Sequence, residues 1–167
     1  MKKIFLLILA FSCIGHAMAQ HCNFDKDETD KFTGKRVVVD AINLGKQVTF
    51  FVAKNGDKYV LALGMVFGGD DRLYISPGDT MMIAIENGKP IVLTSTQEAK
   101  PVTSVSVNQV VSQYYCEYEI SKQDLIQLSQ QDMTAIRVNF GHIAVDLPIK
   151  SKHLDKVATA ATCILSL

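Results

Sequence analysis

The segment 47–69, QVTFFVAKNGDKYVLALGMVFGG, decides the fold class of this chain. From Gln47 to Lys54 and again from Tyr59 to Phe67, large apolar or aromatic side chains recur at every second position. This is the periodicity of a β-strand. Between them stands Asn55-Gly56, a dipeptide suited to a tight hairpin because both residue types tolerate a positive φ. The segment therefore predicts two antiparallel strands joined by a short turn.

Further short apolar runs, separated by turn signals such as Ser76-Pro77-Gly78-Asp79 and Asn87-Gly88, follow the same pattern. The predicted strands cover 37–44, 47–54, 59–67, 72–75, 80–85, 90–94, 102–107, 110–120 and 134–140. Several of them have apolar side chains on both faces. This composition favours a sheet covered on both sides over a sheet that lines a ligand cavity.

Two helices are expected near the C-terminus. Ser121-Lys122-Gln123-Asp124 has the form of a capping box and predicts a short helix through Leu128. Ser151 is a candidate cap for a second helix, whose apolar face has the three-four spacing of Leu154, Val157, Ala158, Ala161, Ile164 and Leu165. Because its polar face lacks dense Lys and Arg, we expect packing against the sheet and not against a membrane surface.

These elements together predict an α+β fold dominated by β-structure. It consists mainly of an antiparallel sheet or sandwich, with one short capped helix and a C-terminal amphipathic helix packed on it. The expected organisation is a signal peptide at 1–19, a polar N-terminal lead-in at 20–34 and a single β-rich globular domain at 35–167.

The first residues have the pattern of a cleavable secretion signal. Lys2 and Lys3 precede an apolar run from Ile4 to Ile14, and small residues then predict cleavage between Ala19 and Gln20. The run is shorter than the roughly 20 residues that a transmembrane helix needs, so no anchor is expected. We therefore predict a periplasmic or extracellular protein, with a lipoprotein anchored through Cys13 as the alternative.

The charge balance argues against a nucleic-acid partner. The chain has 17 basic and 17 acidic residues, and loss of Lys2 and Lys3 with the signal would leave a small negative net charge. No run of basic residues concentrates positive charge locally, so the sequence predicts no basic surface. The expected partner is instead an envelope protein or a small apolar ligand, and the sequence does not define the oligomeric state.

Three cysteines, Cys22, Cys116 and Cys163, remain beyond the signal. An oxidising compartment favours one disulfide, and an odd number leaves at least one thiol without an intramolecular partner. A bridge between Cys22 and Cys116 would hold the polar lead-in, and we take it as the candidate pairing. Cys163 is compatible with a free thiol buried in a helix.

No metal or cofactor site is expected. Asp25-x-Asp27-x-Thr29 resembles the start of a calcium loop, but Asp30 stands where the loop needs Gly and Arg36 where it needs Glu. The histidines show no metal-binding spacing, and the chain has neither a Gly-x-Gly-x-x-Gly nor a Walker motif. Cofactor and metal residues are therefore predicted as none.

Catalytic residues are likewise predicted as none, with two arrangements left as alternatives. Cys116, His142 and Asp146 are the residue types of a cysteine nucleophile with its base and acid, although nothing in their spacing requires proximity. Glu117 and Glu119 project from one face of a predicted strand and form a possible acid and base pair. The alternative to a binding role is thus a hydrolase or thiol-dependent enzyme that uses Cys116 or the Glu117/Glu119 pair.

Tyr118-Glu119-Ile120-Ser121-Lys122-Gln123-Asp124-Leu125, followed later by Ile136-Arg137-Val138, resembles a segment of small exported β-rich proteins of the Bacteroidota type. The Gln after Ala-Met-Ala fits the same group. The resemblance implies export and the order strand, capped short helix, strand, and it includes no catalytic residue. We therefore expect an exported cell-envelope protein that acts as a non-catalytic binding or accessory module.

Overall fold

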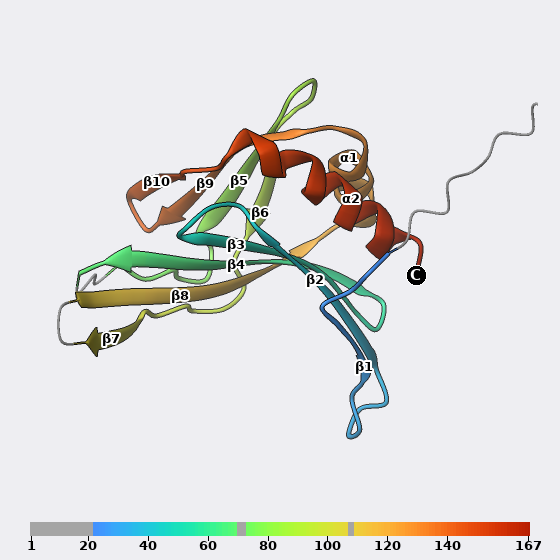
Figure 1. Ribbon diagram of the computed structural model, residues 1–167, viewed down its shortest axis with the longest axis horizontal. Coiled ribbons are helices and arrows are strands. Elements are labelled where there is room, and N and C mark those ends of the chain that lie inside the picture. Colours follow the sequence, from blue (N-terminus) through green and yellow to red (C-terminus); the bar gives the residue numbers. More distant parts are fainter. Residues whose placement is uncertain (1–21, 70–72, 107–108) are drawn as a thin grey trace, which may run out of the picture.

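The computed structural model describes residues 22–69, 73–106 and 109–167, which form two antiparallel sheets and two helices (Figure 1). The larger sheet curves as a half-barrel and has the strand order β1-β2-β3-β4-β8-β7. Its strands are β1 Lys26–Thr29, β2 Arg36–Asn43, β3 Val48–Asn55, β4 Lys58–Gly68, β7 Val102–Ser106 and β8 Gln109–Ile120. The predicted β-dominated α+β class is confirmed.

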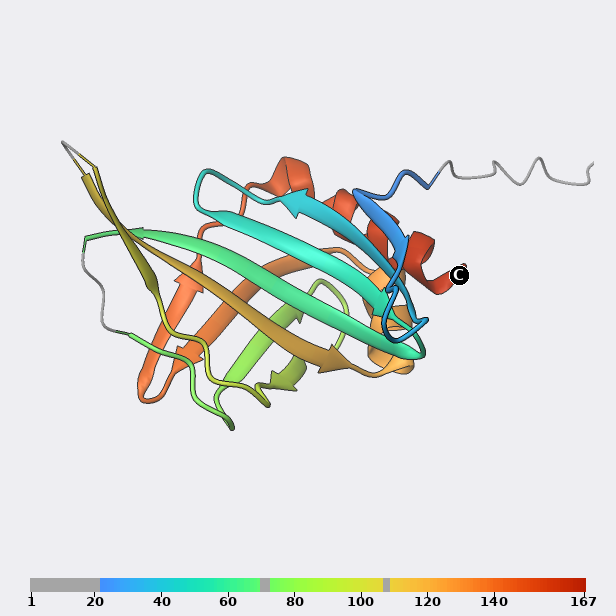
Figure 2. The ribbon, with the colours of Figure 1, turned by 90° about the horizontal axis from the view of Figure 1, so that it is seen from below.

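The smaller sheet has the order β10-β9-β5-β6 and crosses behind the larger one in Figure 2. Its strands are β5 Thr80–Ile85, β6 Ile91–Thr94, β9 Met133–Phe140 and β10 Ile143–Leu147. The helices are α1 Lys122–Gln130 and α2 Leu154–Leu165, and a 3-10 turn at Ser151–His153 leads into α2. No helix in the described part of the chain is long and apolar enough to cross a membrane.

The hairpin predicted at Asn55-Gly56 joins β3 to β4. Asn55 pairs with Lys58, so the two loop residues are Gly56 and Asp57. Gly56 has a φ of +58° and no other residue type among those described has a positive φ. A glycine at the first loop position is the requirement of a type II′ turn, whose twist matches that of the flanking strands.

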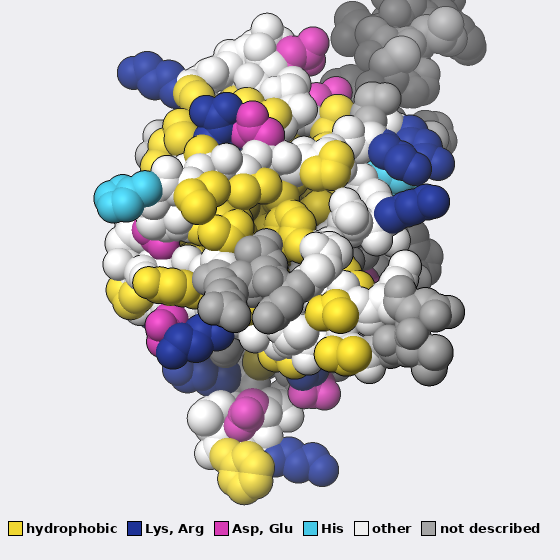
Figure 3. All heavy atoms as spheres, turned by 90° about the vertical axis from the view of Figure 1, so that its left-hand side faces the viewer, with side chains coloured by type: hydrophobic (Ala, Val, Ile, Leu, Met, Phe, Trp, Pro, Cys, Tyr) yellow, Lys and Arg dark blue, Asp and Glu magenta, His cyan; other side chains and the backbone are white. Residues whose placement is uncertain are grey.

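The core lies between the two sheets. The strands of the larger sheet direct alternate side chains inward, including Phe50, Leu61 and Leu63, all with no exposed surface. At the end where β4 and β9 finish, the rings of Phe67 and Phe140 both pack edge-on against Tyr114. Figure 3 looks onto this end and shows hydrophobic side chains gathered in the middle of it, with charged side chains around the margin.

Three local predictions differ from the structure. The polar lead-in contains the edge strand β1, whose exposed residues pair with β2 because strand pairing needs backbone groups and no apolar side chain. The described part of the predicted strand 72–75 forms only a single bridge, from Ile75 to Ala99. β10 was not predicted, and it pairs with β9 through the tight turn after Phe140.

The helices agree with the prediction except at one cap. The hydroxyl of Ser121 accepts the N–H of Asp124 at 3.1 Å, as a capping residue does. The N-cap of α2 is His153 and not Ser151, because the chain first makes the 3-10 turn, and His153 forms no side-chain cap. As expected, the apolar face of α2 packs against the rest of the fold, and its residues Val157, Ala161 and Ile164 are fully buried.

The disulfide joins Cys22 to Cys163 near the end of α2, with a Cα–Cα distance of 5.6 Å. The predicted Cys22–Cys116 bridge is therefore wrong. Cys116 points into the core from β8 and is 3% exposed, so the thiol that stays free is Cys116 and not Cys163. A disulfide indicates an oxidising compartment outside the cytoplasm.

Candidate functional site

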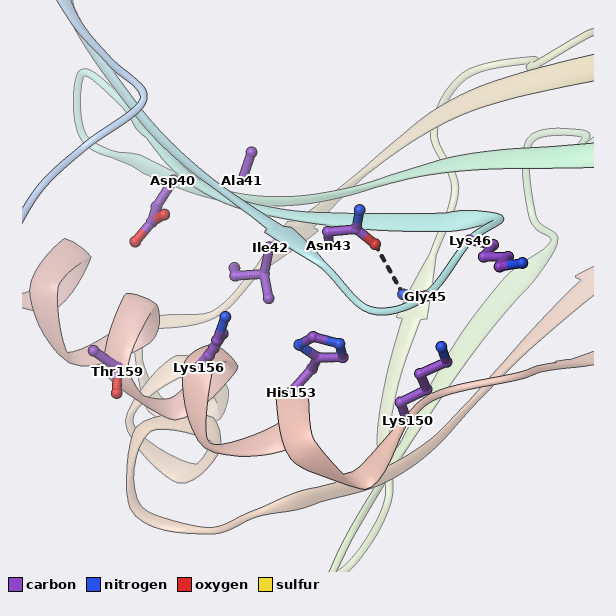
Figure 4. Close-up of a pocket in the computed structure, with 10 residues that line it drawn as sticks. All are labelled: Asp40, Ala41, Ile42, Asn43, Gly45, Lys46, Lys150, His153, Lys156 and Thr159. Atoms are coloured by element: carbon purple, nitrogen blue, oxygen red, sulfur yellow. Dashed lines mark hydrogen bonds between the residues drawn. The ribbon is translucent and has the colours of Figure 1, made fainter.

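A groove of about 600 Å³ lies between the turn that joins β2 to β3 and the start of α2. Its volume is in the range of ligand sites in proteins. Figure 4 shows the residues that line its two walls. The lining residues are Asp40, Ala41, Ile42, Asn43, Gly45, Lys46, Lys150, His153, Lys156 and Thr159.

Backbone contacts hold the two walls of the groove together. The N–H of Lys150 donates to the carbonyl of Leu44 at 3.2 Å, which joins the segment before α2 to the β2–β3 turn. A Cβ on Gly45 would lie 3.3 Å from the carbonyl oxygen of Pro148, so glycine allows the close approach of the two segments. Asn43 stabilises the turn by accepting the N–H of Gly45 at 3.0 Å.

The groove is basic. Lys46 projects from the turn, Lys150 and Lys156 flank His153, and their amino groups point toward the β2–β3 turn and toward β2, respectively (Figure 4). None of these three lysines forms an ion pair with a described residue. Elsewhere the described chain forms the ion pairs Lys26–Glu28, Arg36–Asp27, Lys58–Glu119, Lys100–Glu98 and Arg137–Asp146. Lysines elsewhere, such as Lys89 and Lys122, also form no ion pair with a described residue, so the groove differs from them in bringing three lysines together with a single acidic residue, Asp40.

His153 lies between the lysines, and its environment opposes protonation. Partial burial of the ring lowers its pKa, and the neighbouring positive charges of Lys152, Lys156 and Lys150 lower it further, against a small opposing effect of Asp155. The Nδ1 atom is buried and has no hydrogen-bond partner among the described residues. A buried polar atom without a partner is uncommon in proteins and is a position where a ligand can contribute a hydrogen bond.

The one acidic residue that lines the groove is Asp40. Burial raises the pKa of this carboxyl group, and the charge of Asp25 raises it further. The carboxyl is therefore more easily protonated than an exposed aspartate. Its repulsion of a negative ligand weakens as the pH falls.

This arrangement can hold an anion. Three ammonium groups and the imidazole offer donors to carboxylate, phosphate or sulfate oxygens. The positive end of the α2 dipole lies at the same groove, where no side chain caps the helix. The groove brings together charge, hydrogen-bond donors and a helix N-terminus, and each favours a negative group.

The predicted thiol arrangement is not brought together. Cys116 is buried in the larger sheet, where burial raises the pKa of its thiol to about 11, and its Sγ contacts the carbonyl of Leu63. Asp146 lies in the smaller sheet and binds Arg137 through both carboxylate oxygens. His142 is exposed in the turn between β9 and β10. None of the features that activate a cysteine surrounds Cys116 among the described residues.

Glu117 and Glu119 both lie exposed on the outer face of β8, as the strand period predicts. Each has a partner: Glu117 accepts a hydrogen bond from the hydroxyl of Tyr115 at 3.0 Å, and Glu119 forms an ion pair with Lys58.

The described residues contain no group of three or more His, Cys, Asp or Glu side chains placed to hold a metal ion.

The basic groove corrects the expectation that positive charge is nowhere concentrated. Lys150, Lys152 and Lys156 are close in sequence, and this spacing was the available signal. Lys46 is about a hundred residues away, so only the fold places it beside them. The predicted cleavage residues Ala19 and Gln20, and the alternative lipid-bearing Cys13, lie outside the described residues.

Comparison of the chain with protein-family models, with curated proteins and with solved structures finds no match.

Proposed function

We propose that this chain is an exported, non-catalytic binding module that takes a negatively charged ligand in its basic groove. The observation that carries the proposal is that Lys46, Lys150 and Lys156 line one groove and form no ion pair with a described acidic group, while Asp40 is the single acidic residue in the lining. A negative ligand replaces the small apolar ligand that composition suggested, because the groove is lined by charged groups.

Two observations support a location outside the cytoplasm. The Cys22–Cys163 disulfide is typical of proteins in oxidising compartments. The sequence up to Ala19 has the charge, the apolar run and the small residues of a cleavable signal. Export and an envelope ligand are therefore parts of the same proposal.

The physical basis is electrostatic. Like charges held near one another repel, and a bound anion removes this repulsion while accepting charge-assisted hydrogen bonds. The lysines are exposed, so salt screens their attraction to a ligand. We therefore expect binding to weaken as the ionic strength rises.

The test is isothermal titration calorimetry of the mature chain with inorganic phosphate, sulfate and citrate at low salt. The variant K150Q/K156Q removes two positive charges from the groove. The control K89Q/K122Q removes two positive charges from exposed positions that do not line it. Thermal unfolding of each variant checks that the fold is retained.

We expect the groove variant to bind at least one of these anions about tenfold more weakly, since the loss of one charge-assisted hydrogen bond amounts to about 1.5 kcal/mol or more. The control variant should keep the affinity of the parent chain. Equal loss in both variants would mean that overall charge, and not the groove, attracts the anion. No binding of any of the three anions would refute the proposal.

A further inference from the structure

A second hollow, of about 640 Å³, lies on the outer face of the larger sheet and meets the basic groove at the β2–β3 turn. Asn43, Gly45 and Lys46 line both hollows. In Figure 2 the outer face of this sheet is toward the viewer, with the smaller sheet and both helices behind it. A ligand that passes round the turn would therefore occupy both.

The outer hollow has an aromatic wall. Gly64 on β4 stands between Thr49 on β3 and Tyr115 on β8, and a Cβ at this position would lie 3.5 Å from the ring of Phe51, so the missing side chain leaves the face of the sheet open beside that ring. The two rings pack edge to face with their centroids 5.7 Å apart. Tyr115 is 56% exposed.

The exposed ring of Tyr115 is held in place. Its hydroxyl donates to Glu117, and burial, followed by the charge of Glu117, raises the pKa of the phenol to about 12. The phenol therefore stays protonated and keeps this hydrogen bond at neutral pH. A ring that is already oriented loses little conformational entropy when a ligand packs on it.

The strands β3 and β4, which form the floor of the hollow, offer no strand edge, and the edge strand β7 contributes only Val102 to the lining. β3 pairs with β2 and β4, and β4 pairs with β3 and β8, so the backbone groups of both strands are already bonded within the sheet. An extended peptide that binds by strand addition needs a row of free backbone groups. The polar groups on offer here belong instead to side chains, namely the amides and hydroxyl of Asn43, Thr49 and Gln113 and the Glu98–Lys100 ion pair.

We propose that the ligand is an acidic saccharide chain, with its negative group in the basic groove and a neighbouring sugar ring packed on Tyr115 in the outer hollow. This inference rests on the proposed function, because the negative group takes the groove assigned there. The C–H face of a sugar ring is apolar and suits the aromatic side chain, while its hydroxyls suit the surrounding amide and hydroxyl side chains.

The experiment compares the acidic tetrasaccharide tetragalacturonate with the monomer galacturonate, which can occupy only one of the two hollows, in titrations of the mature chain. Maltotetraose serves as a neutral oligosaccharide and tetraglutamate as an acidic peptide. The variants are Y115A, Y115F, which keeps the ring, and K150Q/K156Q. Y115A removes an exposed side chain, so thermal unfolding should show a folded protein in every case.

We expect Y115A to weaken tetragalacturonate binding by about threefold to tenfold and to leave the monomer unaffected, because an aromatic contact contributes about 0.5–1.5 kcal/mol. Y115F keeps the ring and loses only the hydrogen bond to Glu117, so it should weaken tetragalacturonate binding less than Y115A does, and K150Q/K156Q should weaken both sugars. If Y115A has no effect while K150Q/K156Q still does, this inference fails and the basic groove stands. If K150Q/K156Q has no effect on any ligand, the groove itself is wrong. Tetraglutamate or maltotetraose binding as tightly as tetragalacturonate would overturn the assignment to an acidic saccharide.

Discussion

At the scale of single residues, Cys116 and His153 show how burial decides chemistry. Both are residue types that act in catalysis, and both lie where the charged form is disfavoured. For Cys116 the consequence is an inert thiol in the core. For His153 the consequence is a neutral imidazole whose protonation depends on what enters the groove.

Cys116 should resist alkylation in the folded protein. With a thiol pKa of about 11, roughly one thiol in a thousand is ionised at pH 8, and the side chain is 3% exposed. Iodoacetamide should therefore modify Cys116 only after denaturation, as followed by peptide mass spectrometry without reduction. Rapid labelling of the native protein would instead indicate an accessible, activated thiol and would favour the thiol-dependent enzyme.

His153 should titrate below its usual value of 6.5 in the free protein, and bound anion should raise its pKa. Because the folded-state pKa is lowered, the unfolded chain binds the proton more readily. The stability linked to this group is therefore fully present above pH 6.5 and is lost as the pH falls from that value through the lower folded-state pKa. Anion binding has the opposite preference, since a protonated imidazole attracts the ligand, so affinity should increase as the pH falls.

Proton NMR of the imidazole resonances, with H153Q to assign the signal, measures both effects. The phosphate or sulfate that binds in calorimetry is the ligand to add. A pKa of His153 that is unchanged by a saturating anion would contradict the placement of the ligand beside this ring.

At the scale of elements, the helix α1 depends on its cap. The hydroxyl of Ser121 accepts the N–H of Asp124 and donates to the Asp124 carboxylate at 2.7 Å. S121A should lower the free energy of unfolding by about 1 kcal/mol, measured by urea denaturation. Because α1 does not line the groove, anion affinity should not change. A loss below about 0.3 kcal/mol would show that the cap contributes little here.

The strands that the sequence predicts well are those that bury one face. In β3 and β4 the alternation of side chains follows the division between core and surface, so the hairpin was predictable from periodicity alone. β1 has four exposed residues and no apolar period. The pairing of β1 is a backbone property that its side chains do not reveal. β10 follows β9 after the two-residue loop Gly141-His142, whose glycine has a φ of +58°, and this glycine was the available turn signal.

The groove was not predictable for a different reason. The 3-10 turn that replaces a Ser151 cap places His153 at the start of α2, between Lys150 and Lys156. The opposite wall, including Lys46, comes from a turn in another part of the chain. The sequence spacing of Lys150 and Lys156 shows only that these two charges lie near each other along one segment. That the turn carrying Lys46 faces this segment is a result of the fold and is not visible in the sequence.

At the scale of the whole molecule, one covalent bond joins the two ends of the described chain. The Cys22–Cys163 disulfide closes a sequence separation of 141 residues, and a long loop gives the cross-link a large effect on the entropy of the unfolded chain. Reduction should lower the free energy of unfolding by about 2–5 kcal/mol in denaturant titrations. Equal stability of the oxidised and reduced protein would mean that the bond only holds the segment before β1.

Intact-mass analysis of the protein taken from its own cell envelope tests the proposed export. We expect a chain that begins at Gln20, together with a non-reduced peptide that contains both Cys22 and Cys163. A chain that begins at an acylated Cys13 would instead support the lipoprotein alternative. A chain that retains Met1 would contradict the processed signal.

The most direct test of the central claim, that the groove between the β2–β3 turn and α2 binds anions, is a two-dimensional NMR titration of the mature chain with inorganic phosphate. We predict saturable shifts confined to the amides of residues 43–46 and 150–156. Shifts that do not saturate, or that spread equally to exposed lysines such as Lys89 and Lys122, would contradict a defined site and leave only diffuse attraction of the anion to positive charge.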